Sequence, residues 1–230
     1  MTFLLGIETA TPLLSVAVVG PEGLRAERAA SGERLHSVRL FPFLQELFSD
    51  AGICPRDLRG IAVSQGPGSF TGLRLGVITA KTIAQVLELP VVGVPTLLVL
   101  AAQLPNIGAP VCPVLTSRRG EVYAAVYAPG AFEPPPIVAP FAAAPEEVAR
   151  KLAGFSQILL AGEGAWASQQ IFTEVLGEKA LFAPKLFNYP RAAVVAALGY
   201  YRMERGEGVS AFALLPEYLR SPAITGVSPA

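Results

Sequence analysis

The stretch from Ser64 to Gly76 constrains the fold most; it reads Ser-Gln-Gly-Pro-Gly-Ser-Phe-Thr-Gly-Leu-Arg-Leu-Gly. It follows an apolar, strand-like run at 60–63 and opens a helix-like segment that reaches about Leu89. A strand, a glycine-rich bend with free backbone amides and a helix start together form a geometry that binds phosphates and other anions. The sequence therefore predicts an α/β fold with one phosphate-facing loop. The candidate residues of this loop are Gly66, Gly68, Ser69 and Thr71.

The composition describes a globular chain that can bury a sizeable core. Of the 230 residues, 52% are hydrophobic and 16% are charged, which excludes a disordered protein. Lys and Arg total 18, as do Asp and Glu, so the net charge is zero. A protein that binds RNA or DNA by itself usually carries a basic surface. We therefore expect this chain to contact nucleic acid only as part of a complex, if at all.

The chain is poor in residues that ligate metals. It has one histidine, His36, and two cysteines, Cys54 and Cys112, which match no metal-ligand spacing. The first residues lack the charged region of a signal peptide, and no run of about 18 apolar residues is present. These features predict a cytoplasmic protein with no membrane segment and no metal site.

The order of predicted elements indicates a duplicated mixed sheet. Strand-like runs at 3–7, 13–19 and 24–29 precede a helix that starts at Ser31 or Gly32 and ends at Gly52. The pattern restarts at 111–115 and 121–127, where Leu115-Thr116-Ser117 matches Ile7-Glu8-Thr9 in polarity order. Such duplication is seen in actin-like and sugar-kinase-like ATPases (the ASKHA, ribonuclease H-like class). We expect two subdomains, 1–104 and 105–220, and a disordered tail at 221–230.

Later helices are predicted at 95–103, 145–152, 166–176 and 191–204, with a strand at 158–161 and a loop at 129–136.

Two helices of the first half have more apolar or small residues than one sheet needs. The helix at 32–50 is apolar on two sides, and Pro42 is expected to kink it. Gly72, Gly76 and Ala80 form a stripe of small residues in the next helix, where another backbone can approach closely. Either these features pack inside the subdomain or they contact a partner chain. The candidate partner interface is Leu35, His36, Val38, Phe41, Leu44, Gly72, Gly76 and Ala80.

The chain lacks the residues that phosphate chemistry usually requires. A Walker A loop needs Lys after its last glycine, where this chain has Leu73. Actin-like ATPases have Asp-x-Gly-Thr after the first strand, but residues 8–11 read Glu-Thr-Ala-Thr. The corresponding turn of the second half, 116–120, contains no carboxylate. A pair of carboxylates for metal binding and proton transfer is therefore not predicted, and we expect no catalytic residue.

These motifs resemble the TsaB (YeaZ) family, a paralogue of the catalytic TsaD (Kae1) proteins. The resemblance rests on 64–76, Ala80-Lys81, Pro90-Val91-Val92-Gly93-Val94, the start at Gly6, the segment 119–123 and Pro216-Glu217-Tyr218-Leu219-Arg220. TsaD-like proteins carry metal-binding histidines after the strand that ends Gly-Val, whereas Pro95 to Leu100 contain none. Thr116 stands where the family pattern has Asp.

The resemblance implies a non-catalytic subunit of the bacterial complex that forms threonylcarbamoyladenosine in tRNA. It implies a TsaD-like partner, a TsaE-like ATPase, a homodimer when the partner is absent, and tRNA contact only through the complex. The resemblance leaves open whether a nucleotide binds at the partner interface. The roles of Arg220 and Arg74 also stay open. Arg74 is placed to pair with a nearby carboxylate. The alternative is a weak ATPase or a metallopeptidase-like enzyme of the glycoprotease type.

Overall fold

The computed structural model describes residues 2–32, 35–118 and 120–219. It contains two five-stranded sheets, ordered β3-β2-β1-β4-β5 and β8-β7-β6-β9-β10. In each sheet the first three strands form an antiparallel meander, and the next two run parallel to the first strand. The predicted duplication is therefore confirmed. The strands are β1 (Phe3–Glu8), β2 (Leu13–Gly20), β3 (Gly23–Ser31), β4 (Leu58–Gly66), β5 (Val91–Pro95), β6 (Val111–Thr116), β7 (Val122–Tyr127), β8 (Pro136–Ala143), β9 (Ile158–Ala161) and β10 (Ala180–Phe182).

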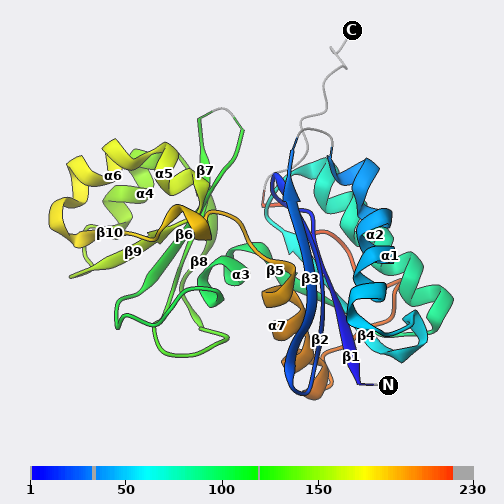
Figure 1. Cartoon of the computed structure of the whole chain (residues 1–230). Coiled ribbons are helices and arrows are strands. Elements are labelled where there is room, and N and C mark those ends of the chain that lie inside the picture. The colour runs from blue at the N-terminus through cyan, green and yellow to red at the C-terminus, as the bar shows by residue number, and fades with distance from the viewer. Residues whose placement is uncertain (1, 33–34, 119, 220–230) are drawn as a thin grey trace, which may run out of the picture.

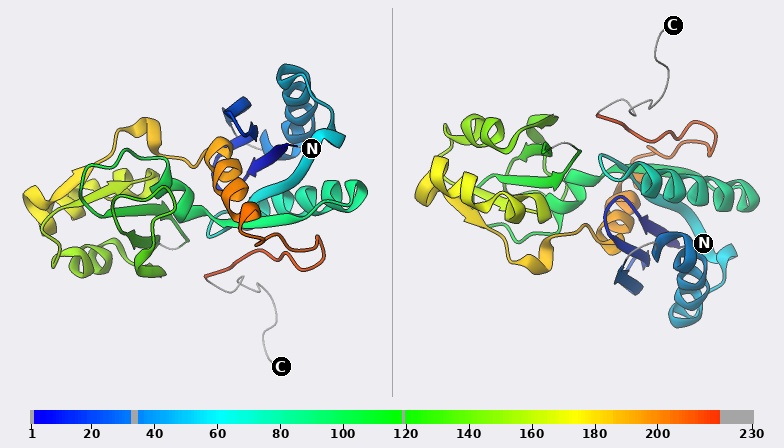
Figure 2. Two further views of the ribbon diagram at one scale, coloured as in Figure 1. Left: turned by 90° about the horizontal axis from the view of Figure 1, so that it is seen from below. Right: turned by 90° about the horizontal axis from the view of Figure 1, so that it is seen from above.

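Helices cover both faces of the N-terminal sheet and divide its core into two layers (Figures 1 and 2). Side chains of α1 and α2 pack with Leu5 and Ile7 on one face, while α7 packs with Leu4 and Ala62 on the other. Within the described residues, no helix is long and apolar enough to cross a membrane. The helices are α1 (Leu35–Ala51), α2 (Phe70–Leu87), α3 (Thr96–Ala102), α4 (Pro145–Leu152), α5 (Glu163–Ala167), α6 (Gln169–Leu176) and α7 (Ala192–Glu204), with short 3-10 turns at 55–57, 177–179 and 185–187.

The helices and strands of the first half lie close to the predicted ranges, whereas those of the second half agree less well with the prediction. The single helix predicted at 166–176 is two helices, α5 and α6, which meet at the non-helical Ser168. The strands β8 and β10 were not predicted. β8 contains two prolines and is mostly exposed or half-buried, and β10 has three residues, so neither carries a clear apolar alternation.

The chain returns to the N-terminal sheet at its end, so the predicted C-terminal subdomain at 105–220 is wrong in its last part. Helix α7 contacts β1, β2 and β4 rather than the second sheet. After it, Val209 pairs with Val91 beside β5, and Leu214 joins the core that α2 covers. The second sheet and its own helices end before α7, and 192–217 belong to the N-terminal body (Figure 1).

Small residues and one carboxylate hold α7 on the N-terminal sheet. A Cβ atom on Gly6 of β1 would lie 2.7 Å from the Ala196 Cβ, so the helix approaches the strand backbone closely. At the start of α7, the Glu27 carboxylate of β3 accepts hydrogen bonds from the Arg191 guanidinium (2.5 Å) and the Ala193 amide (3.1 Å). A carboxylate at a helix N-terminus is also favoured by the helix dipole. Packing and charge together therefore place α7.

We expect Gly199→Ala to destabilise the protein, although Gly to Ala within a helix normally stabilises by about 1 kcal/mol. The new Cβ would overlap the Ala62 Cβ and lie 3.1 Å from Leu4 Cδ2, and both of these residues are fully buried. Such overpacking costs roughly 1–3 kcal/mol. Urea unfolding of the purified variant measures the change. The matched control is Gly154→Ala, because a Cβ there meets nothing within 4 Å; equal stability changes in both variants would contradict the packing argument.

Candidate functional site

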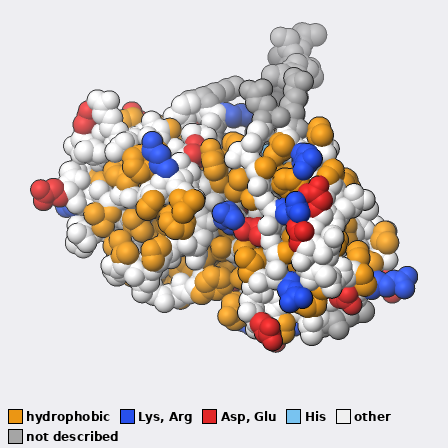
Figure 3. All heavy atoms as spheres, in the orientation of Figure 1, with side chains coloured by type: hydrophobic (Ala, Val, Ile, Leu, Met, Phe, Trp, Pro, Cys, Tyr) orange, Lys and Arg blue, Asp and Glu red, His pale blue; other side chains and the backbone are white. Residues whose placement is uncertain are grey.

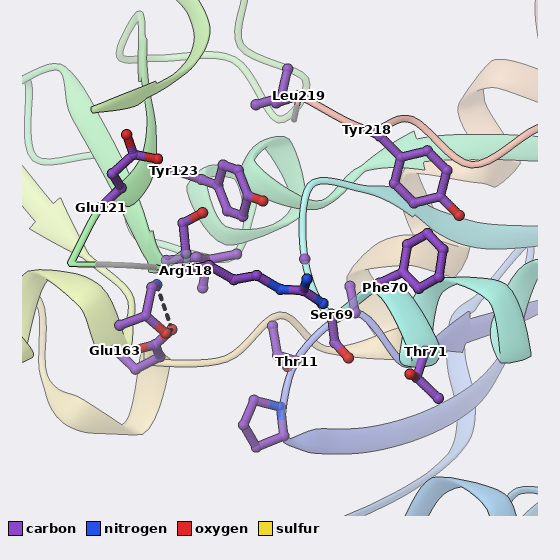
Figure 4. Close-up of a pocket in the computed structure, with 16 residues that line it drawn as sticks. Thr11, Ser69, Phe70, Thr71, Arg118, Glu121, Tyr123, Glu163, Tyr218 and Leu219 are labelled. Atoms are coloured by element: carbon purple, nitrogen blue, oxygen red, sulfur yellow. Dashed lines mark hydrogen bonds between the residues drawn. The ribbon is translucent and has the colours of Figure 1, made fainter. Parts of the chain in front are cut away.

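A cleft of about 1000 Å³ lies between the two halves (Figure 4). Its N-terminal wall is the β1–β2 hairpin at 10–12 and the start of α2 at 68–71. Its opposite wall is the β6–β7 turn at 115–118 together with Tyr123 and Glu163. The end of the described chain, Tyr218 and Leu219, completes the lining. The two predicted hairpin positions of the duplicated fold therefore face one cleft.

The glycine loop lines this cleft, but its backbone is partly engaged with the hairpin. The Ser69 amide donates a hydrogen bond to the Ala10 carbonyl (2.7 Å), and Ser69 Oγ accepts one from the Gly72 amide (3.3 Å) as the cap of α2. Gly68, Ser69 and Thr71 line the cleft. Gly66 does not: it is buried, and a side chain there would collide with the Glu217 carbonyl. Its assignment to the phosphate-facing loop is therefore wrong.

The stripe of small residues in α2 packs inside the subdomain, which corrects the predicted contact with a partner chain. Gly72, Gly76 and Ala80 are buried. Thr9 Oγ1 donates a hydrogen bond to the Gly72 carbonyl (2.8 Å), and a Cβ on Gly76 would collide with the same hydroxyl. The glycines let the hairpin approach α2. A bulky residue at position 76 would disrupt the chain's own fold before it affected any partner.

Glu8, at the position of the actin-like Asp, does not face the cleft. Its side chain is fully buried and accepts hydrogen bonds from the Ala10 amide (2.5 Å) and the Ser64 hydroxyl. Burial raises the pKa of Glu8 to about 8, although the hydrogen bonds from Ser64 and Ala10 each oppose that rise. The carboxyl group therefore serves the hairpin and the β1–β4 junction.

The second half repeats this arrangement with the roles exchanged. Thr116 at the end of β6 donates hydrogen bonds from its amide (2.7 Å) and its hydroxyl (2.8 Å) to Glu163, which follows β9. In the first half the acid is on the first strand and the hydroxyl on the fourth; here the hydroxyl is on β6 and the acid follows β9. A carboxylate therefore reaches the turn that contains none in its own sequence.

Arg74 interacts with aromatic rings, so its predicted pairing with a carboxylate is wrong. Its guanidinium lies 3.8 Å from the centroid of the Phe70 ring, and its Nε donates to the Tyr218 hydroxyl (3.3 Å). The Phe70 and Tyr218 rings are 5.2 Å apart. Arg74 thereby attaches the end of the described chain to the start of α2. Arg220 and the predicted tail at 221–230 lie outside the described residues.

The metal-ligating residue types are dispersed. Among the described residues, no group of three His, Cys, Asp or Glu side chains is placed to hold a metal ion. Cys54 is exposed, and burial raises the pKa of the Cys112 thiol to about 12. His36 is half-buried near the start of α1.

Comparison with known proteins agrees with these features. The model of the TsaD family, tRNA N6-adenosine threonylcarbamoyltransferase, matches residues 24–225. The tRNA threonylcarbamoyladenosine biosynthesis protein TsaB of Bacillus subtilis is 32% identical over 94% of this chain and 93% of its own length. The chain belongs to the TsaB (YeaZ) family. TsaB of Escherichia coli is 36% identical over 54% of both chains.

Solved structures share the duplicated α/β fold of this TsaB-family chain. YeaZ from Pseudomonas aeruginosa superposes with a TM-score of 0.80 at 29% identity and covers 95% of this chain and 100% of its own. An activator of 2-hydroxyisocaproyl-CoA dehydratase from Clostridium difficile superposes with a TM-score of 0.52 at 7% identity, over 89% of this chain and 97% of its own. The latter likeness shows the fold alone: a duplicated α/β architecture with two subdomains.

Several cleft residues of this TsaB-family chain were not predicted as site residues. They are Thr11, Arg118, Tyr123, Glu163 and Tyr218. The internal duplication contained a signal for Arg118 and Tyr123, because the β6–β7 turn corresponds to the hairpin after β1. Glu163 and Tyr218 had none, since each is far in sequence from the wall that it completes.

We expect Glu8→Gln to make the stability of the protein less dependent on pH. The pKa of Glu8 is 4.5 in the ordinary case and about 8 in the folded chain. At a pH between these two values the unfolded chain has lost the Glu8 proton while the folded chain keeps it. Stability therefore falls as the pH rises through this window. The loss is at most about 1.4 kcal/mol per pH unit. Gln is neutral, and it can still accept from the Ala10 amide and donate to Ser64 Oγ.

Urea unfolding at several pH values between 5 and 8 measures how the free energy of unfolding depends on pH. The contribution of Glu8 to this slope is at most roughly 1.4 kcal/mol per pH unit. The control is Glu22→Gln in the exposed turn between β2 and β3. A Glu8→Gln variant with the same pH slope as the unmodified protein would show that Glu8 is ionised throughout.

Proposed function

We propose that this chain acts in the formation of threonylcarbamoyladenosine in tRNA as a non-catalytic subunit that binds and activates a TsaD-family partner. The position of Glu8 carries the proposal. The acid at the place of the actin-like Asp is buried under its own hairpin and bonded to Ser64 and Ala10, so it is not presented to a ligand in the cleft. The relatives named TsaB support the pathway.

We propose that the partner binds the outer surface of α1 and α2. Four large apolar side chains are exposed there: Val38 (68%), Phe41 (61%), Ile78 (61%) and Val86 (76%). Both helices lie on the same face of the N-terminal sheet, where they contact each other. Exposed apolar surface on a pair of helices is typical of an interaction site.

This surface retains only part of the predicted interface. Val38 and Phe41 belong to it, and Leu35 and His36 are half-buried at its edge. Leu44 is buried in the core with the sheet and does not belong to it, like the small residues of α2.

The same surface would pair two copies of this chain when no TsaD-family partner is present. A TsaE-like ATPase would complete the cytoplasmic complex, and tRNA would bind through the complex. On the face shown in Figure 3, Lys and Arg side chains are interspersed with Asp and Glu, which supports a protein that does not hold tRNA alone. A nucleotide at the partner interface is compatible with this arrangement.

We expect Phe41→Glu to abolish binding to a TsaD-family protein while the monomer stays folded. Phe41 is 61% exposed, so its loss removes little from the core, whereas a charge in an apolar interface is costly. Size-exclusion chromatography with light scattering, applied to the mixed proteins, measures the complex. The matched control is Leu186→Glu, 78% exposed in the second half. An intact complex with Phe41→Glu would contradict the proposed surface.

The alternative enzyme function has its own test. The purified chain alone is assayed for ATP hydrolysis and for bound metal. Turnover together with stoichiometric metal would overturn the non-catalytic role, whatever the result with the partner.

A further inference from the structure

The two halves of the chain are joined covalently at two places that lie side by side. One crossing follows α3 at 103–110, and the other runs from β10 to α7 at 183–191. The Gln103 side chain donates hydrogen bonds to the carbonyl oxygens of Phe187 and Tyr189 (3.1 Å each), which ties the two crossings together. Adjacent crossings of this kind act as one hinge, so by themselves they do not fix the angle between the two sheets.

A loop of the second half reaches the end of α7, away from both crossings. It spans 128–135, between β7 and β8, and the Ala128 amide closes it by donating to the Pro135 carbonyl (3.0 Å). Phe132 of this loop packs edge-on against Tyr201 of α7, with ring centroids 5.7 Å apart. Helix α7 is 13 residues long. Its last turn therefore lies about 20 Å from the crossing that enters its first turn.

Glu133 of this loop binds two arginines of the first half. Its Oε1 accepts a hydrogen bond from Arg202 Nε and its Oε2 accepts one from Arg205 Nη2, both at 2.7 Å. The side chains of Arg202 and Glu133 are only 18% and 23% exposed, so salt screens their attraction weakly. Arg202 also donates through Nη1 to the Gly93 carbonyl of β5 (3.0 Å), which holds the guanidinium on the first sheet. Such charge-assisted hydrogen bonds are short and strong.

The contact is charged on both sides near neutral pH. Burial alone would raise the pKa of Glu133, but hydrogen bonds from Arg205 and Arg202 hold that pKa below its ordinary value. Arg205 is held in turn by Glu207, whose carboxylate accepts a hydrogen bond from Arg205 Nε (2.6 Å). The ion pairs that join the loop to α7 are therefore formed throughout the neutral range.

The loop and the cleft lie at opposite ends of β7. This strand begins at Val122, just after the turn that lines the cleft, and ends at Tyr127, where the loop begins. Helix α3, at the junction of the two halves in Figure 1, packs on strands of both sheets. A rotation about the crossings that separates the loop from α7 would therefore also change the distance between the two walls of the cleft.

We propose that the loop 128–135 is a latch that holds the two sheets at one fixed angle and thereby sets the width of the cleft. Packing of α3 keeps the halves together, whereas the latch selects one orientation among those that this packing permits. Glu133 closes the latch on Arg202 and Arg205. The latch is formed on α7, on the opposite face of the N-terminal sheet from the proposed partner surface on α1 and α2. Either proposal can therefore fail alone.

Pulsed electron–electron double resonance on the full chain measures the orientation of the two halves. Spin labels are attached at Thr82→Cys on α2 and Thr173→Cys on α6, two exposed positions. The background is Cys54→Ser, because the other cysteine, Cys112, is buried. We expect one narrow distance distribution with the latch intact and a second population in Glu133→Gln. A rotation of about 15° acting over about 20 Å displaces a label by about 5 Å.

Two further variants separate the latch from a general loss of charge. Glu204→Gln is the matched control, because Glu204 pairs with Arg59 inside the first half, and it should keep the single distribution. Arg205→Gln leaves the Arg202 bond in place and should give a smaller second population; Arg205 is 50% exposed, so this variant is expected to fold. Thermal unfolding verifies that each variant is folded. A single, unshifted distribution in both Glu133→Gln and Arg205→Gln would overturn the latch, as would an equally large second population in Glu204→Gln.

Discussion

The return of α7 to the N-terminal sheet is the constraint on which the rest of the structure depends. Helix α3 contacts β6 and β7 of the second sheet as well as β4 and β5 of the first, and it also contacts α7, which covers β1, β2 and β4. The apolar cluster between them contains residues of both sheets, among them Leu4, Leu97, Leu115 and Val195. The two walls of the cleft are held by this shared core, and the charge pair between Arg191 and Glu27 sets where α7 begins.

A second contact shapes the cleft within this frame. The β1–β2 hairpin rests on α2 because Gly72 and Gly76 leave room for Thr9, whose hydroxyl bonds to the Gly72 carbonyl. Beneath the same hairpin the Glu8 carboxyl accepts hydrogen bonds from the Ala10 amide and the Ser64 hydroxyl. These bonds engage the polar groups of the hairpin inside the N-terminal half.

The proposed partner surface and the proposed latch use different parts of the molecule for different physical reasons. The outer side of α1 and α2 exposes Val38, Phe41, Ile78 and Val86, which suit a protein partner, and it lies on one face of the N-terminal sheet. The latch is charged, and it joins α7 on the other face to a loop of the second half. A partner on α1 and α2 therefore contacts only the first half, whereas the latch acts between the two halves.

The sequence by itself determined the duplicated α/β architecture, the glycine loop and the family, because strand patterns, turns and local motifs are properties of neighbouring residues. It did not determine where the small residues of α2 would be used: the same stripe suits a partner chain or the chain's own hairpin, and only the position of Thr9 decided between them. The placement of α7, the reach of Glu163 to Thr116 and the contact of Tyr218 with Arg74 were decided by tertiary structure. Each of these joins residues distant in sequence, and a periodic pattern shows which face of an element is buried without showing what covers it.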